Sequence, residues 1–256
     1  MTVPAAPKLV VDGCARRFGE TVALAPTDLS VRPGEFVSLV GPSGCGKSTL
    51  FNLISGLIRP DQGQVLIDGI DVTGRPGHVG YMLQKDLLLP WRSVVDNITL
   101  GAALTRGVTR CDRNKAIDAA RRYGLGEFLD HYPHALSGGM RQRVALMRTL
   151  ATAQDVLLLD EPFGALDAQT RLEMQQWLLE VWGETQRTVL FITHDIDESI
   201  FLSDRILVMS PRPGRIVAEL AVDLPRPRTL EMLTTEPFTA VKRRILGLLH
   251  GTEQAV

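Results

Sequence analysis

The sequence predicts an α/β protein: a mixed-sheet core with an N-terminal antiparallel β region and an inserted α-helical subdomain. Short β-type runs alternate with turn residues as far as residue 67, and helical patterns replace them between about 97 and 150. Strand patterns separated by helices then return after residue 154. Strands that alternate with helices are typical of a parallel sheet with helices on both faces.

The N-terminal part is expected to form the antiparallel region. β-type runs occupy 8–14, 27–31 and 64–67, and the last of them follows the turn Arg-Pro-Asp-Gln-Gly at 59–63. The region they form is expected to lean on a further strand at 35–40. Helical segments are clearest at 115–123 and 140–150. No internal repeat interrupts this order.

The C-terminal half is expected to supply the parallel strands. Apolar runs at 156–159, 188–193 and 206–209 predict buried strands, and helical stretches at 167–185 and 197–202 separate them. In the first of these helices an apolar face is spaced at i, i+3, i+4 and i+7, formed by Met174, Trp177, Leu178 and Val181. We interpret these side chains as core.

Bulk properties exclude several classes of protein. The chain has 256 residues and a net charge of −1, without a long Lys/Arg block, which argues against a nucleic-acid partner. Arginines 205, 212, 215, 226 and 228 are interpreted as a solvated surface. The cysteines, Cys14, Cys45 and Cys111, lack metal-ligand spacing and fit a reducing cytosol. Apolar runs are far too short for a membrane span, and the first residues lack the features of an export signal.

A phosphate-binding loop is the most specific motif. The pattern G-x-x-x-x-G-K-[ST] is matched by Gly41, Pro42, Ser43, Gly44, Cys45, Gly46, Lys47 and Ser48, and Thr49 completes the loop. Glycines let backbone N–H groups turn toward phosphates, Lys47 places a charge at the β- and γ-phosphates, and Ser48 offers a hydroxyl to Mg²⁺. A strand pattern precedes the loop and a helix pattern at 48–54 follows it, which favours a P-loop NTPase (RecA-like) core over a Gly-rich turn with a stray lysine.

Two carboxylates follow the predicted strand at 156–159. Asp160 and Glu161 would lie at the sheet edge where nucleotides bind in open α/β folds. Asp160 suits Mg²⁺, and Glu161 suits the orientation and deprotonation of an attacking water. The pair could instead cap the next helix, but Pro162 and the turn at 164–167 disfavour that alternative.

A helix start at 136–142 reads Leu-Ser-Gly-Gly-Met-Arg-Gln, with Ser137 as a good N-cap before Gly138 and Gly139. Taken alone, it is an ordinary helix start. However, the motif Leu-Ser-Gly-Gly-x-x-Gln, placed before a strand that ends in Asp-Glu, resembles the signature of the ATP-binding cassette (ABC) family. The resemblance covers nearly the whole chain and implies an ABC nucleotide-binding domain at 8–237. Its core would be about 8–84 and 154–220, with a helical subdomain at about 85–153 and a short C-terminal tail at 238–256.

The resemblance assigns further residues. Gln84 matches the glutamine loop of the family, Asp167 its aspartate loop and His194 its histidine switch. Glu161, His194 and Gln84 would then be catalytic, and Ser48, Gln84 and Asp160 would hold Mg²⁺. Phe18 lies where the family stacks an aromatic on adenine, although a lone aromatic after a strand is as often core. An isolated histidine is usually structural, but the position of His194 at the end of a strand favours a role in the site.

The resemblance also implies partners. Two copies would pack head to tail, so that residues 137–139 of one copy close over ATP on the loop of the other. A membrane permease is expected to dock near Gln84 to Trp91, where Leu87, Leu88, Leu89 and Trp91 are candidate anchors; burial against the helical subdomain is an alternative. The permease would act with a separate solute-binding protein, and the chain would lie peripherally on the cytoplasmic face of the inner membrane.

The phrases at 88–91, 210–216 and 224–228 resemble the importer subgroup for nitrate, aliphatic sulfonates and taurine. Gly164 replaces a serine that many relatives carry, and we do not interpret this as inactivation. The alternative is a soluble ABC-type ATPase that is not coupled to transport. The DNA-repair type inserts long coiled coils, and the translation-factor type carries two cassettes; neither feature is present here.

Overall fold

The computed structural model describes residues 6–250. Its centre is a six-stranded sheet in the order β10-β9-β3-β8-β7-β6. Five strands run parallel, and β10 pairs antiparallel with β9. The strands are β3 (Phe36–Val40), β6 (Gly80–Met82), β7 (Val156–Asp160), β8 (Thr188–Ile192), β9 (Arg205–Met209) and β10 (Ile216–Ala221). Every residue of β3, β7 and β8 is buried, as predicted for strands covered on both faces.

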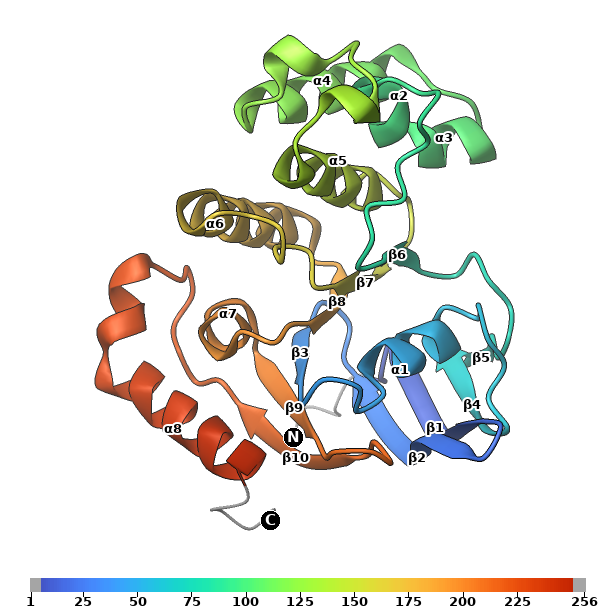
Figure 1. Cartoon of the computed structure of the whole chain (residues 1–256), viewed down its shortest axis with the longest axis vertical. Helices are drawn as coiled ribbons and strands as arrows, with labels where there is room; N and C mark the ends of the chain where they lie inside the picture. Colours follow the sequence, from blue (N-terminus) through green and yellow to red (C-terminus); the bar gives the residue numbers. More distant parts are fainter. Residues whose placement is uncertain (1–5, 251–256) are drawn as a thin grey trace.

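A second, antiparallel sheet lies beside the first. Its order is β2 (Thr21–Val31), β1 (Leu9–Phe18), β4 (Gln62–Ile67) and β5 (Ile70–Asp71). The predicted antiparallel region is therefore confirmed, although β2 begins earlier than residue 27. Leu9, Val11 and Leu24 of this sheet pack with Phe51 of α1 (Lys47–Ile54) and with one face of the central sheet. Figure 1 shows α1 between the two sheets.

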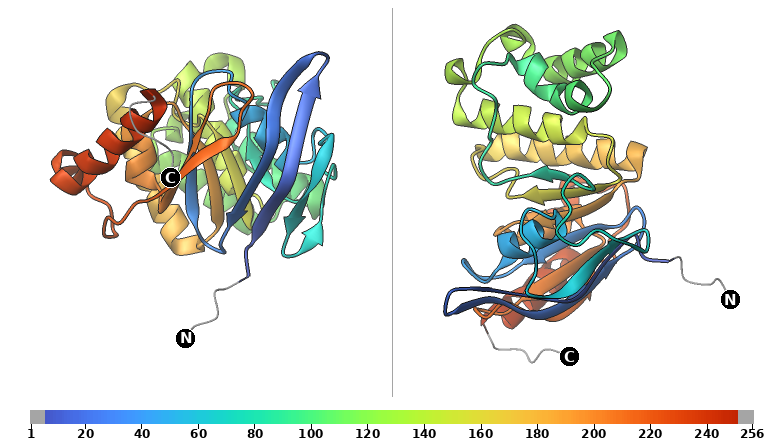
Figure 2. Two further views of the ribbon diagram at one scale, coloured as in Figure 1. Left: turned by 90° about the horizontal axis from the view of Figure 1, so that it is seen from below. Right: turned by 90° about the vertical axis from the view of Figure 1, so that its right-hand side faces the viewer.

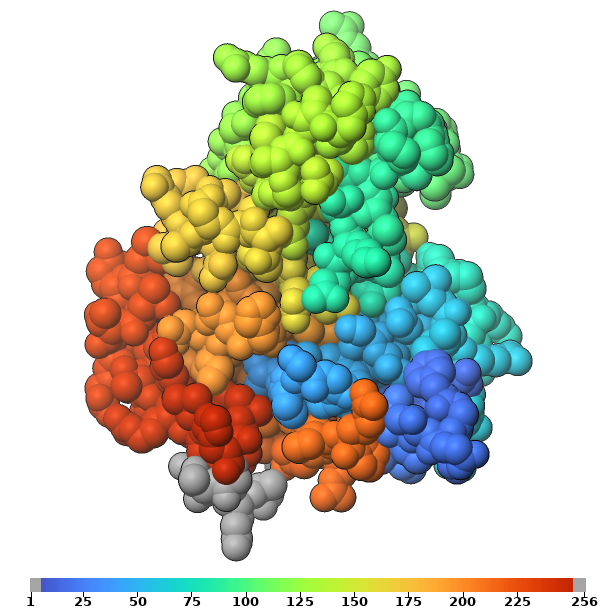
Figure 3. Space-filling model, viewed as in Figure 1, coloured from blue at the N-terminus to red at the C-terminus, as the bar shows by residue number. Residues whose placement is uncertain are grey.

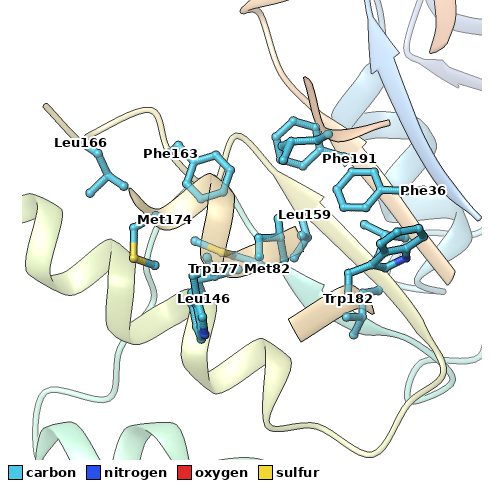
Figure 4. Close-up of a cluster of buried hydrophobic side chains, with 14 of the residues drawn as sticks. Phe36, Met82, Leu146, Leu159, Phe163, Leu166, Met174, Trp177, Trp182 and Phe191 are labelled. Carbon is cyan, nitrogen blue, oxygen red and sulfur yellow. The ribbon is translucent and has the colours of Figure 1, made fainter. Parts of the chain in front are cut away.

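The opposite face of the central sheet is covered by helices. These are α5 (Gly138–Leu150), α6 (Ala168–Thr185), α7 (Ile196–Leu202) and α8 (Glu236–His250). Successive residues of a strand serve opposite faces: Leu157 and Leu159 pack with these helices, whereas Val156 and Leu158 pack toward α1. Figure 4 shows Trp177 and Met174 of α6 beside Leu146 of α5. The predicted apolar face of α6 is confirmed, with Val181 only partly buried.

The helical subdomain stands at one end of the molecule (Figure 2). It contains α2 (Val94–Ile98), α3 (Leu100–Thr105) and α4 (Arg110–Arg122), two short 3₁₀ turns at Gly126–Phe128 and Pro133–Ala135, and α5. Thr109 and Asp112 form a capping box, which explains why α4 begins before the predicted residue 115. Ala116 and Ala120 of α4 are buried.

Residues 238–250, expected as a tail, form most of α8. Phe238 and Ile245 are buried against the helical face of the core, because apolar residues recur there at helical spacing. Residues 251–256 of the expected tail lie outside the described residues. Across residues 6–250, none of the helices combines the length and apolar character needed to cross a membrane.

Candidate functional site

The carboxyl ends of four parallel strands bring the predicted site residues to one edge of the sheet. The phosphate loop follows β3, Gln84 follows β6, Asp160 ends β7 and His194 follows β8. These strands are neighbours in the order β3-β8-β7-β6. Residues that are distant in sequence therefore meet, as expected for an open α/β sheet.

The phosphate loop turns directly into α1. Gly46 is the N-cap residue in a left-handed conformation, with φ of 110°, and no side chain caps the helix there. A Cβ atom on Gly46 would lie 2.8 Å from the Ala23 carbonyl oxygen, so the position suits only glycine. The first N–H groups of α1 are thus left for an anion.

Lys47 lies folded against the loop that precedes it. Its Nζ donates to the carbonyl oxygens of Gly41, at 2.8 Å, and Pro42, at 3.0 Å. The residue is buried. A cation is therefore held within the turn of the loop, where the negative charge of a phosphate would be compensated.

Asp160 is buried at the end of β7. Burial raises the pKa of its carboxyl, and a hydrogen bond from Ser48 and the charge of Lys47 oppose that shift. A hydroxyl and a carboxylate are oxygen ligands of the kind that Mg²⁺ prefers. Residues 6–250 contain no group of three His, Cys, Asp or Glu side chains that could hold a metal ion. This donor set fits an ion that also takes oxygens from a phosphate.

Glu161 has a left-handed backbone conformation with φ of 49°, which is uncommon for a residue with a long side chain. Its N–H donates to Ile192 O at 2.9 Å, which fixes the turn against β8. Its Oε2 accepts a hydrogen bond from Gln84 Nε2 at 3.0 Å, and its Oε1 lies 3.5 Å from His194 Nδ1. The carboxylate of Glu161 thus lies between the two other predicted catalytic side chains.

The phosphate loop, Glu161 and its two neighbours line one cavity of about 290 Å³, whereas the buried Asp160 is not among the lining residues. The predicted residues among its lining are Ser43, Gly44, Gly46, Lys47, Ser48, Thr49, Gln84, Glu161 and His194. Figure 3 views the face on which the phosphate-loop segment, in light blue, adjoins the segments near residues 20, 160 and 210. A phosphate beside Lys47 would be close to a carboxylate that can accept a proton from water.

The predicted signature residues lie elsewhere. Ser137 caps α5 by accepting a hydrogen bond from Met140 N at 3.2 Å, and Ser137 and Gly138 are exposed. Gly138 lines a second cavity, of about 480 Å³, beside Gln84 and Leu87. Residues 137–139 therefore do not line the phosphate cavity of their own chain.

Phe18 is 47% exposed, so the alternative of a core residue is wrong. Its ring lies 5.0 Å from the guanidinium of Arg16, and Phe18 is not among the residues that line the phosphate cavity. Asp167 caps α6 by accepting from Thr170 N at 3.0 Å.

The segment at 87–91 is only partly exposed. Leu87 is 52% and Trp91 70% exposed, whereas Leu88 is buried in the helical core and Leu89 is partly buried. Leu87 and Trp91 therefore remain candidate anchors, whereas the alternative of burial against the helical subdomain is confirmed for Leu88. Arg148 of α5 holds the backbone of this segment by donating to the carbonyl oxygens of Asp86, at 2.6 Å, and Leu87, at 2.8 Å.

Gln142 ends the helix-start motif at 136–142, and its contact with the site was not expected from the sequence. It is buried on α5, where its Nε2 donates to Glu161 O at 2.9 Å and its Oε1 accepts from Ala165 N at 2.7 Å. It therefore holds both sides of the turn that carries Glu161. The sequence feature that could have indicated this contact is a polar residue on the apolar side of a predicted helix.

The interpretation of the C-terminal arginines as a solvated surface is also wrong in part. Arg226 lies over the ring of Trp182 at 4.2 Å and Arg228 is buried, whereas Arg212 and Arg215 are exposed as expected. Burial lowers the pKa of Arg228 to about 10. The burial and contacts of these arginines result from how the chain after β9 packs on the core, and the local sequence does not predict them.

The fold and this site define a P-loop nucleotide hydrolase with an inserted helical subdomain. A family model described as ABC transporter matches residues 24–164. The chain belongs to the ABC transporter family as an ATP-binding subunit, and it is an ATPase.

Similar proteins are known from bacteria. A taurine import ATP-binding protein of Rhizobium johnstonii is 45% identical over 247 residues, which cover 93% of this chain and 94% of that protein. A nitrate import ATP-binding protein of Synechococcus elongatus is 42% identical over 241 residues, which cover 93% of this chain and 37% of that longer protein.

A solved structure agrees in fold. It is a dimeric, post-hydrolysis state of the ATP-binding cassette MJ0796 bound to ADP and Pi. It is 31% identical, with a TM-score of 0.75, and the match covers 85% of this chain and 100% of that chain.

Proposed function

We propose that this ATPase drives an importer for a small solute of the nitrate, sulfonate or taurine type. The observation that carries the proposal is the second cavity, which lies between residues 84–88 and the start of α5 and is lined by the exposed Leu87. Trp91, which is also exposed, follows in the same segment. Exposed apolar side chains beside a cavity are typical of an interface with another protein. The names of the similar taurine and nitrate import proteins support the solute class.

Within the site, Glu161 acts as the base that deprotonates the attacking water, and Gln84 and His194 orient that water and the γ-phosphate. The short distances from Glu161 to both side chains support these roles. Lys47 and the N–H groups of α1 bind the phosphates, and Phe18 stacks on adenine. Mg²⁺, held by Ser48, Asp160 and Gln84, would neutralise charge on the phosphates.

Two copies of the chain enclose ATP between them. Ser137 and Gly138 are exposed at the start of α5, and they are absent from the lining of the phosphate cavity in their own chain. A helix N-terminus of this kind attracts the γ-phosphate of ATP bound to the second copy. The attraction is lost when that phosphate has been cleaved and released. The dimeric state of the similar cassette supports this arrangement. Hydrolysis would then open the dimer.

The dimer docks on a membrane permease through Leu87 and Trp91, and so lies peripherally on the cytoplasmic face of the inner membrane. A separate solute-binding protein delivers the solute to the permease. We place the core of the domain at about 8–84 and 154–220, and the helical subdomain, which contains α2 to α5, at about 85–153.

The test combines copurification with transport. The tagged chain is isolated from membranes of its own cells, the integral-membrane subunits are identified, and uptake of taurine, alkanesulfonates and nitrate is measured in reconstituted vesicles. The double variant Leu87→Ala, Trp91→Ala should lose the permease and solute uptake but keep ATP binding. Leu104→Ala, at a 76% exposed apolar position of the helical subdomain, is the matched control.

The proposal fails if no permease accompanies the wild-type chain, or if the double variant and the control retain it equally. The first result would favour an ATPase that is not coupled to transport.

A further inference from the structure

The turn between β9 and β10, residues 210–215, reaches the phosphate loop. Ser210 N donates to Arg215 O at 2.9 Å, which closes the turn. Gly214 exchanges backbone hydrogen bonds with β2: it donates to Ala23 O at 3.2 Å and accepts from Ala25 N at 2.9 Å. The turn is thereby attached to the strand that borders the phosphate loop (Figure 1).

The contact between this turn and the phosphate loop is close. A Cβ atom on Gly214 would lie only 1.8 Å from the carbonyl oxygen of Cys45. Any side chain at position 214 would therefore push the two segments apart. Pro211 and Pro213 restrict the backbone on either side of Arg212, so the point from which its side chain extends has little freedom.

Arg212 is fixed over the loop by two hydrogen bonds. Its Nε and Nη2 donate to Gly44 O at 3.2 Å and 3.1 Å. This acceptor is a neutral carbonyl, and within residues 6–250 no ion pair joins Arg212 to a carboxylate, unlike Arg205 and Arg226. Arg212 is exposed, and no carboxylate of the described residues pairs with its charge at the cavity that also contains Lys47.

We propose that Arg212 is a second cationic ligand of the nucleotide and binds its phosphate chain at the phosphate loop. A guanidinium offers five N–H groups, so two bonds to Gly44 O leave others for phosphate oxygens. A guanidinium group that is already positioned loses little side-chain conformational freedom when it binds the phosphate. This inference rests on nucleotide binding at the loop and is independent of the permease and the solute.

The test compares ADP binding by calorimetry in three variants. Arg212→Ala should weaken ADP binding about tenfold, the usual effect of losing one charge-assisted hydrogen bond. Arg212→Lys should retain part of the affinity because it keeps the charge but loses the planar set of N–H donors of the guanidinium. Arg215→Ala is the matched control: this exposed arginine of the same turn is not among the residues that line the phosphate cavity, and its variant should bind like the wild type.

A purely structural role of Arg212 predicts a different thermal midpoint and a different salt dependence of ADP binding. If it only clamps Gly44, the thermal midpoint of the nucleotide-free Arg212→Ala variant falls, and the salt dependence of ADP binding stays as in the wild type. Our proposal predicts an unchanged midpoint and a shallower loss of affinity between low and high potassium chloride.

Equal ADP affinity of Arg212→Ala and the wild type, or an unchanged salt dependence, would overturn the role of Arg212 alone. A wild-type chain that does not bind ADP would overturn the assignment of the phosphate loop itself, and the role of Arg212 with it.

Discussion

Gln84 and Glu161 lie 77 residues apart in the sequence and are joined by a hydrogen bond of 3.0 Å. The bond connects the ends of β6 and β7, which are neighbouring parallel strands. Gln84 also opens the segment that leads to Leu87 and Trp91. A partner that moves this segment on docking would therefore change the environment of the proposed catalytic carboxylate.

Replacement of the proposed base separates binding from chemistry. Glu161→Gln should keep ATP binding but lower the rate of phosphate release about 10²- to 10⁴-fold, because the amide cannot accept the proton of water. It should also accumulate an ATP-bound dimer that size-exclusion chromatography detects. Glu184→Gln, at an exposed position of α6, is the control. Unchanged phosphate release would remove Glu161 as the base.

The phosphate-loop lysine should matter most for affinity. Lys47→Ala removes the buried cation that bonds Gly41 O and Pro42 O, so the phosphate charge is left uncompensated. We expect ADP binding, measured by calorimetry, to weaken at least about tenfold. Lys115→Ala, on the exposed side of α4, should bind normally. Tight ADP binding by Lys47→Ala would contradict the assignment of the loop.

Gln142 should act through the position of Glu161. Gln142→Ala leaves Ala165 N without this partner and should lower the free energy of unfolding by about 1–3 kcal/mol. Gln142→Glu can still accept from Ala165 N but cannot donate to Glu161 O. We expect kcat to fall in both variants while the Kd for ADP changes little. If Kd rises and kcat is kept, Gln142 belongs to nucleotide binding instead.

Glu198 should make stability depend on pH. It is buried on α7 and accepts a hydrogen bond from Gln175 Nε2 at 2.8 Å. Burial raises its pKa above the usual 4.5, although the hydrogen bonds from Thr193 and Gln175 oppose the shift. A raised folded-state pKa favours the native state below the unfolded pKa, and this contribution is lost as the pH rises through the folded-state pKa.

Glu198→Gln removes this titration. Its thermal midpoint should rise relative to the wild type as the pH increases from below 4.5 to neutral, by an amount equivalent to about 1.4 kcal/mol per unit of pKa difference. Glu184→Gln serves again as the exposed control. A difference between variant and wild type that is constant with pH contradicts the prediction.

Most of the central fold could be predicted because its signals are local. The strands at 156–159, 188–193 and 206–209 are apolar runs bounded by turns, and the apolar face of α6 follows helical spacing. α8 was not predicted, because its amphipathic pattern follows a Pro-rich stretch and takes its stability from contact with the core.

The sequence by itself determined the phosphate loop, the carboxylates that follow β7 and the existence of the strands that carry them. Parallel strands end at one edge of the sheet, so the meeting of Lys47, Glu161 and His194 was already implied. Only the tertiary structure decided which side chains are covered and what they contact. Leu88 is buried while Leu87 is exposed, Gln142 holds the turn of Glu161, and Arg212 lies over the phosphate loop. The physical reason is that exposure and long-range hydrogen bonds depend on how separate elements pack, which no local pattern specifies.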